Sequence, residues 1–256
     1  YSYVDAPAGP RRLFPRRRAS EPVVLETRFG WDPGEPDGDH DWPVASLFVV
    51  VDEATVDTMG PVFDALAEQI APWPVEIIAL ALGAEVADDV ARMHPSVMVV
   101  VVPPHASAGQ IRNVGLRLAR GDYVAFLDAP VELAPGAVAA MVKAHDAGHA
   151  FVAGELHNLT PSAIGWASYF DDPGRGSFAR TPLLRVGGFD DVALGVEALA
   201  REKLLRAGHR ATSNPLLTFG HRTGLATAGE YVRARFALGQ ASADGPVSRP
   251  VGAGLP

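Results

Sequence analysis

Apolar runs alternate with amphipathic segments along the central part of the chain. Short runs rich in β-branched residues predict buried strands at 45–51, 75–82, 97–102 and 123–128, and a fifth strand opening at 151–153. After each of the first four runs, apolar residues recur every three or four positions, which predicts helices at 59–71, 84–93, 107–120 and 136–145. Strand and helix therefore alternate, and this order predicts an α/β fold with a mostly parallel sheet flanked by helices.

The predicted sheet places its candidate ligand-binding residues at one edge. In a doubly wound parallel sheet, ligands bind beyond the carboxyl ends of the strands. Asp52 follows the first predicted strand and Asp128 ends the fourth, so we expect both carboxylates at this edge. The sequence from Gly154 onward has a weaker pattern, and we expect this irregular second half to complete the walls of the site.

The pattern also divides the chain. Residues 1–43 carry a basic segment at 11–18 and an acidic segment at 32–41, separated by Pro and Gly, which predicts a flexible, solvated arm. Docking of its arginines on a partner or an anionic surface is an alternative reading. We expect one domain over 44–240 and a disordered tail over 241–256.

Composition excludes several classes of function. The chain has 256 residues and no cysteine, so it has no disulfide framework and no thiol nucleophile. Its net charge of −8 argues against binding of duplex nucleic acid. No apolar run approaches the length of a transmembrane helix, and we expect a cytoplasmic protein.

Four segments in fixed order carry a family resemblance. Residues 110–116 read QIRNVGL and 119–128 read ARGDYVAFLD, which resembles the RN-x-G, A-x-G and strand-ending D-x-D pattern of family 2 glycosyltransferases with the GT-A fold. Downstream, 186–191 read VGGFDD, similar to the GGFDE turn of that family, and 195–208 resemble the helix that follows it. The resemblance extends over 43–238 and implies a GT-A fold.

The resemblance implies an enzyme that moves a sugar from a nucleotide-sugar donor to an acceptor, which the sequence does not identify. In the family, a carboxylate pair, a divalent cation (Mn²⁺ or Mg²⁺) and often a late His neutralise the donor diphosphate, and an acidic residue deprotonates the acceptor. Carried over by position, the base is Glu197 and the metal ligands are Asp128 and His221. The substrate-binding candidates are Asp52, Arg112, Asn113, Asp128 and Arg180, the last from a Gly-rich stretch that also contains Arg175.

Departures from the family pattern keep a second function open. The D-x-D motif is reduced to DAP at 128–130, so a cation loses one expected carboxylate, and the second strand ends in ALGA at 81–84 where the family has an Asp pair. Glu197 stands where the family has Asp, and its alternative role is a surface ion pair with Arg201. The alternative to a transferase is a catalytically degenerate fold that serves as a binding or scaffolding subunit.

Overall fold

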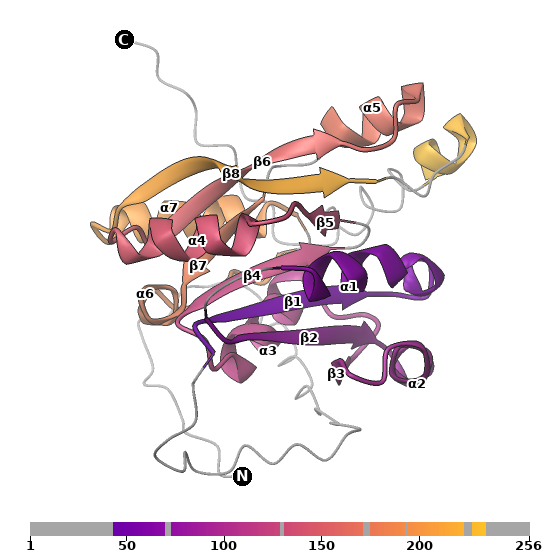
Figure 1. Cartoon of the computed structure of the whole chain (residues 1–256), viewed down its shortest axis with the longest axis horizontal. Helices are drawn as coiled ribbons and strands as arrows, with labels where there is room; N and C mark the ends of the chain where they lie inside the picture. Colours follow the sequence, from indigo (N-terminus) through magenta and orange to yellow (C-terminus); the bar gives the residue numbers. More distant parts are fainter. Residues whose placement is uncertain are drawn as a thin grey trace, which may run out of the picture.

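The structure is a computed structural model that describes residues 43–69, 73–128, 131–170, 175–192, 194–222 and 227–233. The predicted arm, apart from residue 43, and the predicted tail lie outside the described residues. Within the described ranges, an α/β architecture is formed around one 8-stranded sheet (Figure 1). This confirms the predicted fold class.

The sheet joins strands from both halves of the chain in the order β3-β2-β1-β4-β7-β6-β8-β5. Its strands are β1 (Ala45–Val51), β2 (Val75–Leu82), β3 (Met98–Val102), β4 (Tyr123–Asp128), β5 (Val131–Leu133), β6 (Phe151–Asn158), β7 (Gly176–Ala179) and β8 (Ala211–His221). The first four pair in parallel, as predicted from their buried β-branched runs. The second half is more regular than its weak pattern indicated, because β7 pairs antiparallel with both β4 and β6.

Helices cover both faces of the sheet. They are η1 (Val56–Thr58), α1 (Gly60–Ala67), α2 (Ala84–Met93), α3 (Ala108–Leu118), α4 (Ala137–Asp146), α5 (Ala163–Phe170), α6 (Arg180–Arg185) and α7 (Val196–Arg206). Alternate side chains of β1 point to opposite faces. Leu47 packs in the core that α1, α2 and α4 share, and Phe48 packs in the core beneath α3, α6 and α7.

A buried polar network fixes the amino ends of the parallel strands. The Ser46 hydroxyl of β1 and the backbone N–H of Arg120 both donate to Glu76 Oε1, at 2.5 and 2.7 Å, and Arg120 Nε donates to Glu76 Oε2 at 3.0 Å. The N–H of Gly121 in turn donates to the Ser46 hydroxyl. Because this network joins β1, β2 and the turn before β4, it sets their register and thereby the position of the opposite sheet edge.

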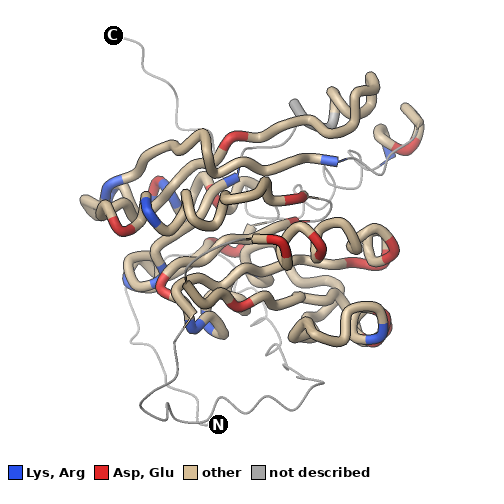
Figure 2. Tube along the Cα trace, in the orientation of Figure 1, with Lys and Arg blue, Asp and Glu red and all other residues tan. Residues whose placement is uncertain are grey.

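Charge is unevenly distributed over the fold. The charged residues of η1, α1 and α2 are acidic except for Arg92, whereas α6 and α7 together carry five basic residues and two acidic ones (Figure 2). No helix among the described residues is long and apolar enough to cross a membrane. Positive charge for an anionic ligand therefore has to come from the α7 side of the molecule or from α3.

Candidate active site

Three elements bring two carboxylates and one guanidinium group together at the carboxyl edge of the sheet. Arg112 of α3 donates from Nη2 to Asp128 Oδ2 of β4 at 2.6 Å and to Glu197 Oε1 of α7 at 3.2 Å. Its Nε also lies 3.4 Å from Glu197 Oε1. Arg175, just before β7, donates from Nη1 to the same Asp128 oxygen at 3.1 Å. We call these four residues the Arg112 cluster.

Local structure holds α3 and α7 in place around this cluster. Ser107 caps α3 in a capping box with Gln110, and its hydroxyl also donates to Asp191 Oδ1 at 2.5 Å. Gly109 permits this close approach, because a Cβ there would lie 1.8 Å from the Asp190 carbonyl oxygen. The turn over 187–191 is thereby bound to the start of α3, and Glu197 follows it in the first turn of α7.

Burial sets the electrostatics of the cluster. Arg112 is 5% exposed and Glu197 9% exposed, whereas the side chain of Asp128 is 37% exposed. Burial would raise the pKa of Asp128, but the charges of Arg112 and Arg175 outweigh it and hold the pKa of that carboxyl below its usual value. Burial would likewise lower the pKa of Arg112, and the two carboxylates reverse that effect, so Arg112 stays charged.

Glu197 differs from Asp128 in the direction of its pKa shift and in its hydrogen bonding. Burial raises the pKa of Glu197 above its ordinary value, even though Arg112 and Arg175 oppose the rise. Its Oε1 accepts from Arg112, but its buried Oε2 has no hydrogen-bond partner in the structure. A buried polar atom without a partner is uncommon and costs free energy, so this oxygen is a candidate contact for a ligand.

The position of Glu197 decides against its alternative role. A surface ion pair with Arg201 would require an exposed carboxylate, yet Glu197 is buried and forms an ion pair with Arg112. The prediction of a surface pair is therefore wrong. The physical reason is that α7 packs its first turn toward α3, which directs this carboxylate inward.

The two arginines of the Gly-rich stretch lie at opposite ends of β7. Because β7 runs antiparallel to β4, residue 176 lies near the carboxyl end of β4, while Ala179 pairs with Tyr123 at the amino end. Arg175 therefore reaches Asp128. Arg180 instead donates to the Leu116 carbonyl at 3.3 Å, and the structure does not bring it to the Arg112 cluster.

The other predicted substrate-binding residues lie apart from one another. Asp52 follows β1, and its Oδ1 accepts from the Thr55 hydroxyl at 2.6 Å. Asn113 of α3 binds the backbone of Phe189 with both polar atoms of its amide, at 2.8 and 2.9 Å. Asn113 thus holds the 187–191 turn against α3, and its polar atoms are engaged in this structural contact.

The described residues do not offer a ready divalent-cation site. No group of three His, Asp or Glu side chains in the described part of the chain is arranged to hold a metal ion. One oxygen of Asp128, Oδ2, already accepts from two guanidinium groups. His221, the other predicted ligand, ends β8 and pairs with Val131 of β5. The donor set therefore does not fit a firmly held cation, which normally takes several oxygen ligands.

A cavity of about 370 Å³ adjoins the cluster on the α7 side. Arg175 lines it and also binds Asp128, and Ala198, which follows Glu197 in α7, lines it as well. Local sequence patterns did not identify this cavity, because its walls come from segments distant in the chain. The four-residue strand β7 separates Arg175 from Arg180 and places them at opposite ends of that strand.

Comparisons with known proteins agree with the observed fold. Residues 54–168 match the family model described as glycosyl transferase family 2. Among solved structures, the mannosyltransferase PcManGT from Pyrobaculum calidifontis, in complex with GDP-Man and Mn²⁺, is similar, with a TM-score of 0.55 and 18% sequence identity. The match covers 80% of this chain and 66% of that chain, just under two thirds of its length. No curated protein sequence matches the chain.

Proposed function

The chain carries a family 2-like glycosyltransferase domain with the GT-A fold, and from this premise we propose that it transfers a sugar from a nucleotide-sugar donor to an acceptor hydroxyl. The observation that carries the proposal is Glu197, a buried carboxylate with a raised pKa and one oxygen without a partner. A general base works best when its pKa lies near the working pH. Burial moves Glu197 in that direction.

In the proposed reaction, the acceptor oxygen forms a bond to the anomeric carbon of the donor sugar. The bond between that carbon and the diphosphate oxygen breaks, and its electron pair leaves with the nucleoside diphosphate. The acceptor proton passes to Glu197 Oε2, the oxygen that makes no hydrogen bond in the structure. Arg112 holds Oε1, so it fixes the orientation of the carboxylate during the transfer.

The leaving diphosphate needs positive charge, and we assign this role to Arg175 and Arg112. Arginine presents a planar fork of donors that matches phosphate oxygens. Both guanidinium groups contact Asp128 Oδ2 in the structure, so Asp128 holds them at the carboxyl end of β4. The neighbour's complex with GDP-Man and Mn²⁺ makes a guanosine donor and Mn²⁺ reasonable first compounds to test.

Binding and turnover of a donor test the proposal. The melting temperature is measured with GDP, UDP and GDP-Man, and the release of nucleoside diphosphate is then followed for each donor that binds. A ligand specific to the folded state at a hundredfold excess over its Kd stabilises by about 2.7 kcal/mol. Release that depends on Glu197 supports the transferase, and the absence of binding by every nucleotide would reject it.

A binding or scaffolding subunit is the second candidate, and one observation favours it. The ion pairs of Arg112 and Arg175 already engage both carboxylates of the cluster, so the site is neutralised internally. If the protein is a scaffold, Glu197→Gln should leave its affinity for its binding partners unchanged. Nucleotide binding without release of diphosphate, in the presence of a broad set of sugar acceptors, would favour this candidate.

A further inference from the structure

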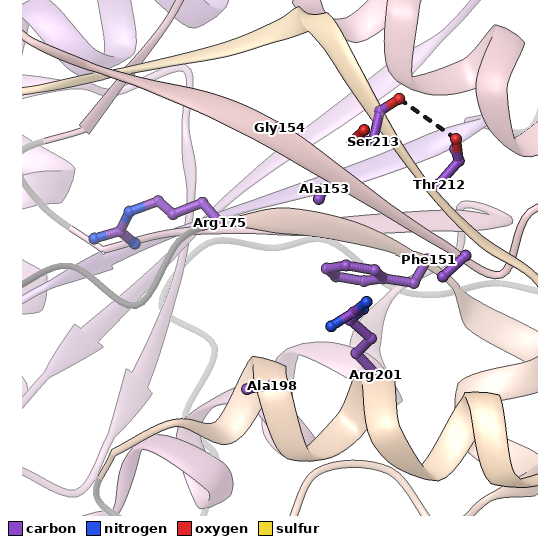
Figure 3. A pocket seen from close by; sticks show the side chains of 9 residues that line it. Phe151, Ala153, Gly154, Arg175, Ala198, Arg201, Thr212 and Ser213 are labelled. Atoms are coloured by element: carbon purple, nitrogen blue, oxygen red, sulfur yellow. Dashed lines mark hydrogen bonds between the residues drawn. The ribbon is translucent and has the colours of Figure 1, made fainter. Parts of the chain in front are cut away.

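The cavity beside the Arg112 cluster is lined by polar, aromatic and small residues. It is enclosed by β6, β8, α7 and the residue before β7, and its polar lining consists of Arg175, Arg201, Thr212 and Ser213. Phe151 supplies the aromatic wall, and small residues complete the lining. Figure 3 shows Arg201 rising from α7 to the ring of Phe151, with Thr212 and Ser213 on the strand across the cavity.

The charge of this cavity has one sign. Arg175 and Arg201 are the charged residues among those that line it, and no acidic side chain is among them in the described part of the chain. The guanidinium carbon of Arg201 lies 6.0 Å from the centre of the Phe151 ring, a cation–π contact that orients the group without neutralising it. Arg175 is already paired with Asp128, whereas Arg201 has no carboxylate among the described lining residues, and its guanidinium group favours an anionic occupant.

The cavity is also next to the proposed base. Ala198 of its wall is the residue after Glu197, and Arg175 spans from the cavity to Asp128. An occupant of the cavity therefore lies next to the Arg112 cluster, with which the cavity shares Arg175.

We propose that this cavity binds the acceptor through an oxyanion, a phosphate or carboxylate group, held by Arg201. The inference rests on the proposed transferase function and adds the chemical class of its acceptor. The volume of about 370 Å³ lies near the lower end of small-molecule sites, which range from about 300 to 1,000 Å³, so it suits a sugar-sized group. The hydroxyls of Thr212 and Ser213 supply polar contacts for the neutral part of such a group.

Calorimetric titration of the full chain with three probes tests the inference. Glucose 6-phosphate and glucuronate carry the two candidate oxyanions, and glucose carries neither. We expect at least one acidic probe to bind at least about tenfold more tightly than glucose, since charge-assisted hydrogen bonds are the strong ones. The acidic probe that binds more tightly identifies the oxyanion as phosphate or carboxylate.

Matched variants of α7 locate the binding. Arg201→Gln is expected to weaken the preferred acidic probe by at least about tenfold, and Arg201→Lys to restore part of the loss. Arg206→Gln is the control, because Arg206 is exposed on the same helix, pairs with Glu202 and does not line the cavity. Equal weakening by Arg201→Gln and Arg206→Gln would show general charge attraction and overturn the inference.

Failure of this inference is distinguishable from failure of the proposed function. If nucleotides stabilise the protein but neither acidic probe binds more tightly than glucose, the acceptor assignment is overturned and the transferase stands. If an acidic probe binds with the expected dependence on Arg201 while no nucleotide binds, the cavity is an oxyanion site and the transferase is rejected. Inorganic phosphate is titrated as well, and binding as tight as that of glucose 6-phosphate would overturn recognition of a sugar.

Discussion

Arg112 Nη2 lies 2.6 Å from Asp128 Oδ2, and the same atom lies 3.2 Å from Glu197 Oε1. One guanidinium group thus joins the end of β4 to the first turn of α7. Arg112 and Glu197 are 85 positions apart in the sequence. The second half of the chain is positioned over the parallel sheet by this buried ion pair as well as by apolar packing. Removal of the Arg112 guanidinium group is therefore expected to affect both the stability of the fold and the candidate site.

Replacing Arg112 by Leu is expected to destabilise the protein by about 3–5 kcal/mol, because removing one partner of a buried pair leaves its carboxylates uncompensated. The free energy of unfolding in urea is the measurement. Arg206→Gln serves as the control, since that exposed i,i+4 pair with Glu202 contributes at most about 0.5 kcal/mol. Equal stability of the Arg112→Leu and Arg206→Gln proteins would contradict the role given to Arg112.

Arg175 and Arg180 form a natural pair for testing the phosphate site. Arg175→Gln is expected to reduce the rise in melting temperature caused by a nucleoside diphosphate, because a charged donor at the carboxyl end of β4 is lost. Arg180→Gln should retain the rise, since Arg180 lies at the other end of β7 and binds the Leu116 carbonyl. If only Arg180→Gln lost the rise in melting temperature, the phosphate contact would be assigned to Arg180 and not to Arg175.

Glu197→Gln is expected to lower the rate of sugar transfer by about 10²–10⁴-fold while nucleotide affinity changes little. The amide keeps the shape of the side chain and can still accept from Arg112, but it is not basic. Because burial raises the pKa of Glu197, the rate should fall as the pH drops through a value above that of an ordinary glutamate. A rate within about threefold of the parent protein, with an unchanged pH profile, would remove Glu197 as the base.

Nucleotide binding is expected to depend only weakly on divalent cations. Asp128 Oδ2 is engaged by two arginines, and the described residues hold no three-ligand group that fits a metal. The melting-temperature rise with a nucleoside diphosphate is compared in EDTA and in Mn²⁺. A rise that disappears entirely in EDTA would show that a cation is needed and that Asp128 exchanges its arginine partners for it.

His145 gives the fold a measurable pH dependence. Burial lowers the pKa of His145 to about 4, while its ring contacts the His149 carbonyl and the Ser177 hydroxyl and stacks on Tyr123. The unfolded chain, with a pKa near 6.5, binds more protons between these two values. Stability should therefore fall as the pH drops from about 6.5 towards 4.

The free energy of unfolding, measured across that pH range, checks this prediction. Asp146 faces the same region, and its charge opposes the lowering of the His145 pKa. His145→Gln keeps a polar side chain but does not titrate, so the variant should lose most of the decline. An identical decline in the variant would assign it to other groups.

The core of the fold was predictable because its signal is local. The four parallel strands are continuous buried runs, and α3 carries its own capping box and apolar stripe, so neighbouring residues suffice to predict them. The four residues of β7 have too little alternation to predict a strand. Its pairing with β4 and β6 depends on distant segments, and so does the placement of Arg175.

The candidate site was likewise predictable from the sequence only in part. Asp128 and Glu197 were identified from motifs, and the structure brings both to one guanidinium group. The alternative to a catalytic role for Glu197 was a surface ion pair with Arg201, four residues along the same helix, because local spacing shows only such pairs. Arg112 is the partner instead, and this contact exists only after α3 and α7 have packed against each other.

The pairing of β7 with strands on both sides also governs how the protein unfolds. Three residue pairs join β7 to β4 and three join it to β6, so backbone hydrogen bonds run without interruption from the parallel strands to the second half. If β7 detached, β4 would become an exposed edge with an apolar sequence, which favours aggregation. The two halves of the described domain should therefore melt in a single cooperative transition, with no stable intermediate in which the parallel strands persist alone.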